Sequence, residues 1–131
     1  MNDWEWTPNV AVGPIRLAGP TPVESGLAGF RLTELKRSGG ELWTYYWHEI
    51  DEISVIALDG KVASVACHKY FCYGGRNLIG LTDGEIRMQF RDHTITTADF
   101  PFGYTLEVDA LGLELDFIDD RVSIASAIGP N

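Results

Sequence analysis

Three short segments of this chain contain residue types that can do chemistry, and the first holds two cysteines and a histidine. Cys67, His68 and Cys72 offer the thiolate and imidazole ligands that zinc prefers. However, four residues between the cysteines is at the edge of the usual spacing, and the chain has no second cysteine pair. On a strand, Cys67 and His68 would also point to opposite faces. We therefore predict reduced thiols without a metal or cofactor, and keep a zinc site and a regulated disulfide as alternatives.

The second segment is a histidine among carboxylates. His48 and Glu49 precede Asp51 and Glu52, and a histidine that titrates near neutrality can act as a general base when a carboxylate orients it. No other motif of the chain supplies a nucleophile or an oxyanion donor. The interpretation we favour is a polar loop between two strands, so we predict no catalytic residues. A small hydrolase that uses His48 and these carboxylates is the alternative.

The third segment is an aromatic run that contains Trp43, Tyr45, Tyr46 and Trp47. Such side chains stack on bases in single-strand binding proteins, but those platforms sit in basic grooves and this one does not. Because side chains alternate along a strand, one face of this run is expected to join the core. The other face remains either core or an aromatic anchor at a protein interface, where Trp and Tyr dominate binding energy.

The charge of the chain favours basic partners. Nineteen Asp and Glu residues oppose ten Lys and Arg residues, which gives a formal net charge of −9. This field repels nucleic acid and anionic membranes and attracts basic surfaces. No Lys or Arg occurs between Ser38 and Gly60 or between Asp92 and Asp120, and the second stretch carries eight acidic residues: Asp92, Asp99, Glu107, Asp109, Glu114, Asp116, Asp119 and Asp120. We therefore predict an acidic binding face.

The elements that must position these residues are short helices and antiparallel strands. Thr21-Pro22-Val23-Glu24 and Thr82-Asp83-Gly84-Glu85 both match a capping box, which predicts helices over about 21–28 and 82–91. Alternation over 104–109 and 113–117 predicts strands with one apolar and one acidic face. Residues 41–48 form the matching aromatic strand, and 53–58 is apolar on both faces, which predicts a central strand.

The chain shows a weak internal repeat. Residues 53–65 and 113–124 each contain an apolar strand, a two-residue turn, a basic residue and a second apolar strand. The turns are Asp59-Gly60, a strong hairpin signal, and Asp119-Asp120, a weaker one. We therefore predict one α+β domain over 1–131, in which a helix–β–β–β unit occurs twice, at about 12–68 and 77–128. Its short helices would pack on one face of an antiparallel sheet.

Two segments in the second half of the chain form a recognisable pattern. The first contains Gly75, Asn77, Leu78, Ile79 and Gly80, and the second is a later hairpin segment that includes Leu111, Gly112, Leu113, Val122 and Ile124, with Asp120 in place of a turn glycine. Through this pattern, residues 50–128 resemble a group of small bacterial immunity proteins. These proteins are encoded beside polymorphic or contact-dependent growth inhibition toxins. The resemblance implies neutralisation of a cognate toxin domain by tight stoichiometric binding. Nuclease toxins, or other enzymes with a basic cleft, would suit an acidic inhibitor.

The charge and strand patterns, and not the resemblance, nominate the toxin-binding residues. The predicted surface combines aromatic anchors with carboxylates that give specificity: Trp43, Tyr45, Trp47, Glu49, Asp51, Glu52, Glu107, Asp109, Glu114 and Asp116. The start of the chain lacks the features of a signal peptide, and no apolar run approaches the roughly 20 residues of a membrane span, which predicts a cytoplasmic protein. A structural or assembly module is a further alternative.

Overall fold

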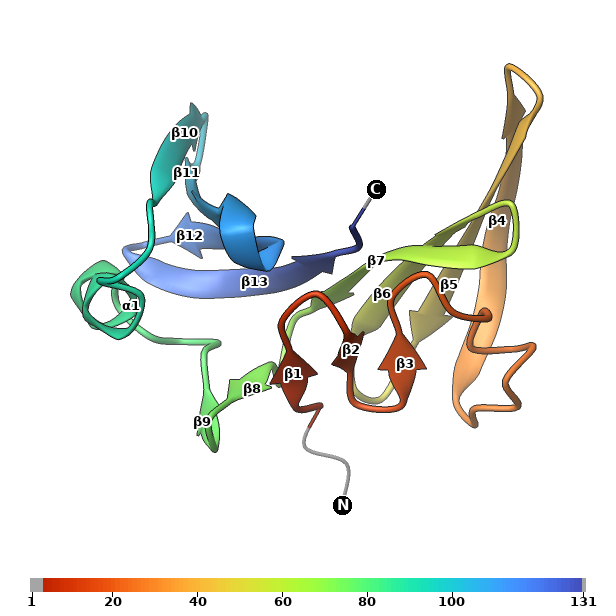
Figure 1. Ribbon diagram of the computed structural model, residues 1–131, viewed down its shortest axis with the longest axis horizontal. Helices are drawn as coiled ribbons and strands as arrows, with labels where there is room; N and C mark the ends of the chain where they lie inside the picture. Colours follow the sequence, from red (N-terminus) through yellow and green to blue (C-terminus); the bar gives the residue numbers. More distant parts are fainter. Residues whose placement is uncertain (1–3, 131) are drawn as a thin grey trace.

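A computed structural model describes residues 4–130 as a protein dominated by one antiparallel sheet (Figure 1). Its eight strands follow the spatial order β10-β11-β12-β13-β7-β6-β5-β4. Their bounds are Phe30–Ser38 for β4, Glu41–His48 for β5, Ile53–Leu58 for β6, Lys61–Cys67 for β7, Thr96–Phe100 for β10, Gly103–Val108 for β11, Leu113–Ile118 for β12 and Arg121–Ile128 for β13. Two four-stranded meanders therefore meet where β13 pairs with β7.

The predicted α+β class needs correction. The antiparallel sheet is present, but the structure is 54% strand and its described residues contain a single short α-helix, so the fold is β-rich. A three-residue 3₁₀ helix, η1 (Asp109–Leu111), joins β11 to β12. No helix among residues 4–130 has the length and apolar character needed to cross a bilayer.

The two meanders have the same strand register. Each residue pair of the β6–β7 hairpin recurs in the β12–β13 hairpin at positions sixty residues later: Val55 pairs with Val65, and Leu115 pairs with Ala125. Each hairpin also has a register shift at the same place, after Ile56 in one half and after Asp116 in the other. Where β7 meets β13, Ala66 pairs with Ser126 at the centre, which relates the two halves by a local two-fold rotation.

The hairpin turns follow the predicted chemistry. Asp59 and Gly60 have φ values of +50° and +82°, and Asp119 and Asp120 have values of +53° and +62°. Positive φ at both central positions is the geometry of the tight hairpin turn, because its twist matches that of the strands. The Asp-Asp pair therefore forms the same turn as Asp-Gly, with an aspartate held in the left-handed region that glycine enters more easily.

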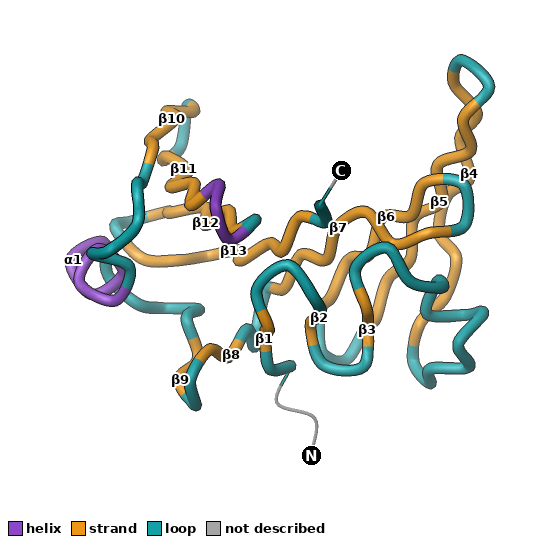
Figure 2. Tube along the Cα trace, viewed as in Figure 1, coloured by secondary structure: helices purple, strands orange, loops and turns teal. Residues whose placement is uncertain are grey.

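One face of the sheet carries the core. The side chains that point to it from the central strands are fully buried, among them Val55, Val65, Leu115 and Ala125. Small elements cover this face, and Figures 1 and 2 show them on one side of the β7–β13 pair. They are β1 (Trp6–Thr7), β2 (Ala11–Val12), β3 (Ile15–Arg16), β8 (Cys72–Tyr73), β9 (Arg76–Asn77) and the helix α1 (Asp83–Gln89).

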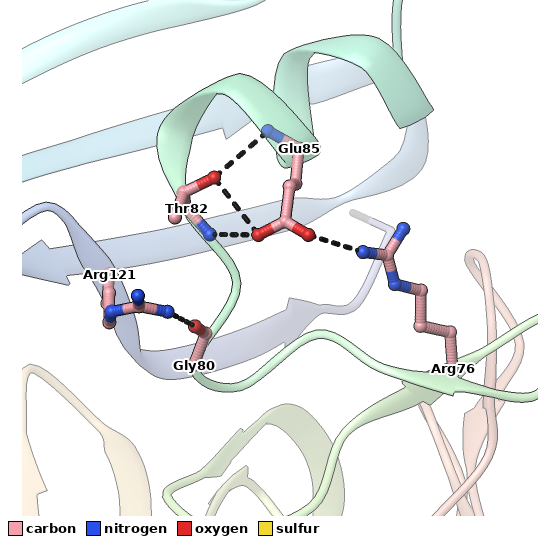
Figure 3. Close-up of polar contacts among 5 residues, drawn as sticks. All are labelled: Arg76, Gly80, Thr82, Glu85 and Arg121. Carbon is pink, nitrogen blue, oxygen red and sulfur yellow. Dashed lines mark hydrogen bonds and ion pairs between the residues drawn. The ribbon is translucent and has the colours of Figure 1, made fainter.

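The second predicted helix is confirmed as α1. Thr82 Oγ1 accepts from the Glu85 backbone N–H at 3.3 Å, and Glu85 Oε1 accepts from the Thr82 N–H at 3.0 Å, which completes the capping box (Figure 3). Arg76 pairs with the same carboxylate at 2.7 Å. These interactions hold the pKa of Glu85 below its ordinary value, chiefly through the Thr82 backbone bond. Ile86 and the following Phe90 bury the inner side of the helix.

We expect Thr82→Ala to lower the free energy of unfolding by about 1 kcal/mol, the usual cost of losing an N-cap side chain. Urea denaturation followed by circular dichroism measures this change. Thr94→Ala is the matched control, since Thr94 is exposed and lies outside helix and strand. Equal effects of the two substitutions would contradict a capping role for Thr82.

The first predicted helix, over 21–28, is wrong. Thr21 Oγ1 does accept from the Glu24 N–H at 3.1 Å, and the Ser25 N–H reaches the Thr21 carbonyl. The chain then leaves the helical path, because Gly26 takes a φ of +71°, which ends a helix after one turn. Val23 is half exposed, so this turn also lacks the buried apolar side that stabilises α1.

Candidate binding surface

The second face of the large sheet, here named the outer face, consists of the side chains that alternate with the core residues. One row crosses all eight strands through successive cross-strand pairs: Arg31, Trp47, Ser54, Ala66, Ser126, Glu114, Glu107 and Thr96. The middle of the row holds only small side chains. Trp47 and Glu114 lie four strand spacings apart, or about 19 Å along the sheet. The outer face thus has a low centre between an aromatic half and an acidic half.

The aromatic half lies on β5 and β6. Trp43, Tyr45 and Trp47 are half-buried and alternate with Thr44 and Tyr46, which face the core. Leu58 pairs with Trp43, and Ile56 pairs with Tyr45, so the apolar character continues onto the neighbouring strand. The structure therefore separates the aromatic run as its alternation predicts, with Tyr46 inside and the three others outside.

The acidic half lies on β11 and β12. Glu107 and Glu114 face one another as a direct cross-strand pair, and Asp116 follows two residues later on the same face. Asp116 accepts a hydrogen bond from Thr105 Oγ1 at 2.7 Å. Partial burial raises the pKa of Glu114, and the charges of Glu107, Asp116 and Asp109 raise it further. Like charges placed opposite one another on a sheet destabilise it.

No cation relieves this repulsion within the described residues. The four ion pairs among residues 4–130 all lie elsewhere, and they join Arg31 to Glu49, Lys69 to Glu52, Arg76 to Glu85 and Arg87 to Asp83. A carboxylate group in a partly buried site without a basic neighbour costs free energy. An external cation would remove that cost.

The structure does not gather all ten nominated residues on one surface. Six lie on the outer face, namely Trp43, Tyr45, Trp47, Glu107, Glu114 and Asp116. Glu49 lies at its rim, where its carboxylate accepts from the Trp47 indole N–H. Asp109 begins η1, beside the row. Asp51 and Glu52 belong to the turn between β5 and β6.

The predicted surface role of Asp51 and Glu52 has a competing structural explanation. Asp51 Oδ2 accepts from the Trp4 indole N–H at 3.0 Å, and Trp4 is buried on the core side. Glu52 pairs with Lys69 at 3.3 Å. Both carboxylates therefore stabilise the turn and its packing, and neither joins the outer face.

His48 is likewise engaged in the fold. Its Nδ1 accepts from the Asp51 backbone N–H at 3.0 Å, and its ring packs against Trp4 and Phe30. Gly29 lies so close that a Cβ there would come within 2.3 Å of Nε2. One ring nitrogen of His48 therefore holds the turn, and the other lies against Gly29.

The cysteine segment has no metal geometry in the described residues. Among residues 4–130, no group of three or more His, Cys, Asp or Glu side chains is placed to hold a metal ion. Cys67 is fully buried in the core. Burial, with smaller effects of Cys72 and Asp51, raises the pKa of its thiol to about 12.

We expect Cys67 to resist alkylation in the folded protein. A thiol with a pKa of about 12 is almost entirely protonated at pH 8, and only the thiolate reacts. In the variant Cys72→Ser, which leaves Cys67 as the sole thiol, iodoacetamide should label the protein in urea and not in native buffer, as read by mass spectrometry. Equal labelling rates in the two conditions would contradict this account.

Two pockets lie beside the end of β13 and share the segment Ile128-Gly129-Pro130 as a wall. The larger, of about 500 Å³, is lined by apolar side chains of the aromatic half, including Trp43, Ile56 and Leu58. The smaller, of about 280 Å³, is lined by Asp109 and Glu114 and by Asn9. The pockets thus extend the division of the outer face into an apolar and an acidic half.

Sequence reasoning missed the apolar members of this surface. Ile56 and Leu58 alternate with buried Val55 and Ala57, which predicted a strand covered on both sides. The apolar character of both faces was the only sequence signal for Ile56 and Leu58, and it cannot distinguish a covered face from a half-exposed pocket. No sequence pattern indicated Asn9 as part of this surface. Its position depends on a long-range hydrogen bond from its side chain to the Ala110 carbonyl at 3.2 Å.

In comparisons with known proteins, no family model, curated protein or solved structure matches the chain.

Proposed function

We propose that this protein is an immunity protein that neutralises a cognate bacterial toxin by stoichiometric binding through the outer face, without catalysis. The observation that carries the proposal is the direct pairing of Glu107 with Glu114, beside Asp116 and without a basic neighbour in the described part of the chain. This arrangement disfavours the free protein. It becomes favourable when a partner supplies positive charge, since complementary potentials steer and stabilise association.

The aromatic half supplies the second requirement of a tight interface. Trp43, Tyr45 and Trp47 present large, half-buried side chains on a strand, and aromatic side chains have few rotatable bonds to order on binding. Aromatic anchors near the centre of an interface carry much of its energy, and charged residues at the edge fix specificity. The partner that fits is a protein with a basic surface and exposed apolar side chains, such as a nuclease toxin.

Charge also argues for the class of partner. With a net charge of −9, and with Glu107, Glu114 and Asp116 on the outer face, the protein disfavours nucleic acids and anionic membranes as ligands. An inhibitor that protects the cell producing a toxin acts where that toxin is made, so we propose a cytoplasmic location.

The two halves of the sheet are best explained as a duplicated unit whose outer faces have diverged. At equivalent positions sixty residues apart, the aromatic half has Trp47 where the acidic half has Glu107, and Ile56 where it has Asp116. The buried positions stay apolar, as at Val55 and Leu115. The change from apolar to acidic side chains at these outer positions, while the buried positions Val55 and Leu115 stay apolar, supports the outer face as the site of binding.

Co-expression tests the proposal. The toxin domain encoded beside this gene is produced from an inducible promoter, with or without this protein. We expect growth to be rescued and a 1:1 complex to be recovered by size-exclusion chromatography. A complex without rescue would favour an assembly role, and the absence of both would overturn the proposal.

A further inference from the structure

We infer that the apolar pocket of the outer face is a docking site for a large apolar side chain of a basic partner segment. The partner's neighbouring Lys or Arg side chain would enter the acidic pocket. The inference rests on the proposed function for its biological setting, but its geometry concerns only the two pockets. The partner segment carries one aromatic or aliphatic anchor and one cation.

The apolar pocket is built for such an anchor. Its volume of about 500 Å³ exceeds that of a single side chain, and Trp43, Ile56, Leu58 and Ile128 give it apolar walls. Trp43 and Leu58 face each other across β5 and β6, and Ile56 lies two residues before Leu58 on the same face. Removing apolar surface from water at these walls favours binding of an apolar group.

The charges at the two pockets set the orientation of the segment. Lys61 is the only ionisable residue among those that line the apolar pocket, and its ammonium group disfavours a second cation there. The neighbouring pocket has Asp109 and Glu114 on its walls and no Lys or Arg. A cation is therefore repelled from the apolar pocket and attracted to the acidic pocket. A neutral apolar group instead favours the apolar pocket.

The shared wall brings the two preferences together. Ile128, Gly129 and Pro130 line both pockets, and Figure 1 shows the chain after β13 turning away from β1–β3. The Gly129 N–H donates to the Ala63 carbonyl at 2.7 Å, which fixes this segment against β7. In an extended peptide, side chains two residues apart point to the same face. A short peptide that crosses this segment can therefore place one such side chain in each pocket.

Three capped tripeptides test the inference without any toxin. The probe acetyl-Trp-Gly-Lys-amide is titrated into ¹⁵N-labelled protein, and the controls replace Trp with Ala or Lys with Gln. We expect a dissociation constant of about 1 mM for the probe and a loss of about tenfold for each control. Chemical shifts should move at the Trp43 indole N–H, which reports on the apolar pocket, and at the Gly112 amide, which reports on the acidic pocket.

Variants of the protein complete the design. Leu58→Arg should lose the probe, while Leu35→Arg, on the exposed edge strand β4, should keep it. Glu114→Gln should reduce the difference between the Lys and Gln peptides to less than twofold. Absence of shifts at both pockets, or equal binding of all three peptides, would overturn the inference. Probe binding without toxin rescue would instead leave the docking site standing and remove the toxin proposal.

Discussion

Replacing Glu114 with Lys should weaken partner binding by at least about 100-fold while leaving the fold intact. The substitution places a cation where the proposed partner presents its own, and like charges brought together in an interface cost several kcal/mol. Within the free protein, the new ammonium group would lie opposite Glu107 and near Asp116, so it relieves existing repulsion. Isothermal titration calorimetry against the purified toxin domain measures the change.

Glu24→Lys is the matched control for this substitution. It changes the net charge by the same amount, but Glu24 is exposed in the turn over residues 22–26, outside the β-sheets. If Glu24→Lys weakened binding as much as Glu114→Lys, the effect would come from total charge, and the acidic half of the outer face would lose its assigned role.

The milder variant Glu114→Gln should separate stability from binding. The pKa of Glu114 is higher in the folded state than in the unfolded chain. At a pH between the unfolded and the folded pKa, the folded protein therefore binds more protons than the unfolded chain, and its stability falls as the pH rises. The glutamine variant has no proton to lose and should avoid this loss. At pH 7 we expect a higher melting temperature than wild type together with weaker partner binding. A lower melting temperature at pH 7 would contradict this explanation.

The largest loss of stability is expected from Trp6→Ala, at about 3–5 kcal/mol. Trp6 is fully buried, and its ring centroid lies 5.3 Å from that of Phe71, 4.9 Å from that of Tyr73 and 6.4 Å from that of Phe90. It thereby ties the first strand of the described chain to β8 and to the end of α1. The cavity left by its removal would cost a large part of the free energy of unfolding, which is about 5–15 kcal/mol for a typical domain.

Trp6→Phe gives a comparison that isolates packing. The indole Nε1 of Trp6 has no hydrogen-bond partner within residues 4–130, so its loss removes an unsatisfied buried donor. We expect Trp6→Phe to cost less than half as much as Trp6→Ala in urea denaturation. If the two variants were equally destabilised, the ring cluster would not be the source of stability.

Local signals predicted much of the sheet. The alternation over 104–109 and 113–117, the two turns beginning at Asp59 and Asp119, and the capping box of Thr82 and Glu85 each act over a few residues, and all appear in the structure. The capping signal at Thr21 failed because Gly26 ends the turn before an apolar side forms. A cap can start a helix, but packing is needed to extend it.

Long-range contacts explain the rest of what the sequence could not show. The pairing of β13 with β7 joins residues about sixty apart, and no local pattern specifies that strand order. The same limit applies to the site. Alternation identified Glu107, Glu114 and the three outer aromatic residues, whereas the turn role of Asp51 depends on Trp4, 47 positions away.

The central claim, that the outer face binds a basic toxin, is tested most directly by calorimetric titration of the purified toxin domain with this protein at two salt concentrations. We predict a 1:1 complex whose affinity falls as salt rises from 50 to 500 mM, because exposed charge pairs are screened. The Glu114→Lys variant should show at least about 100-fold weaker binding. A complex of unchanged affinity in that variant, or no complex at all, would contradict the account.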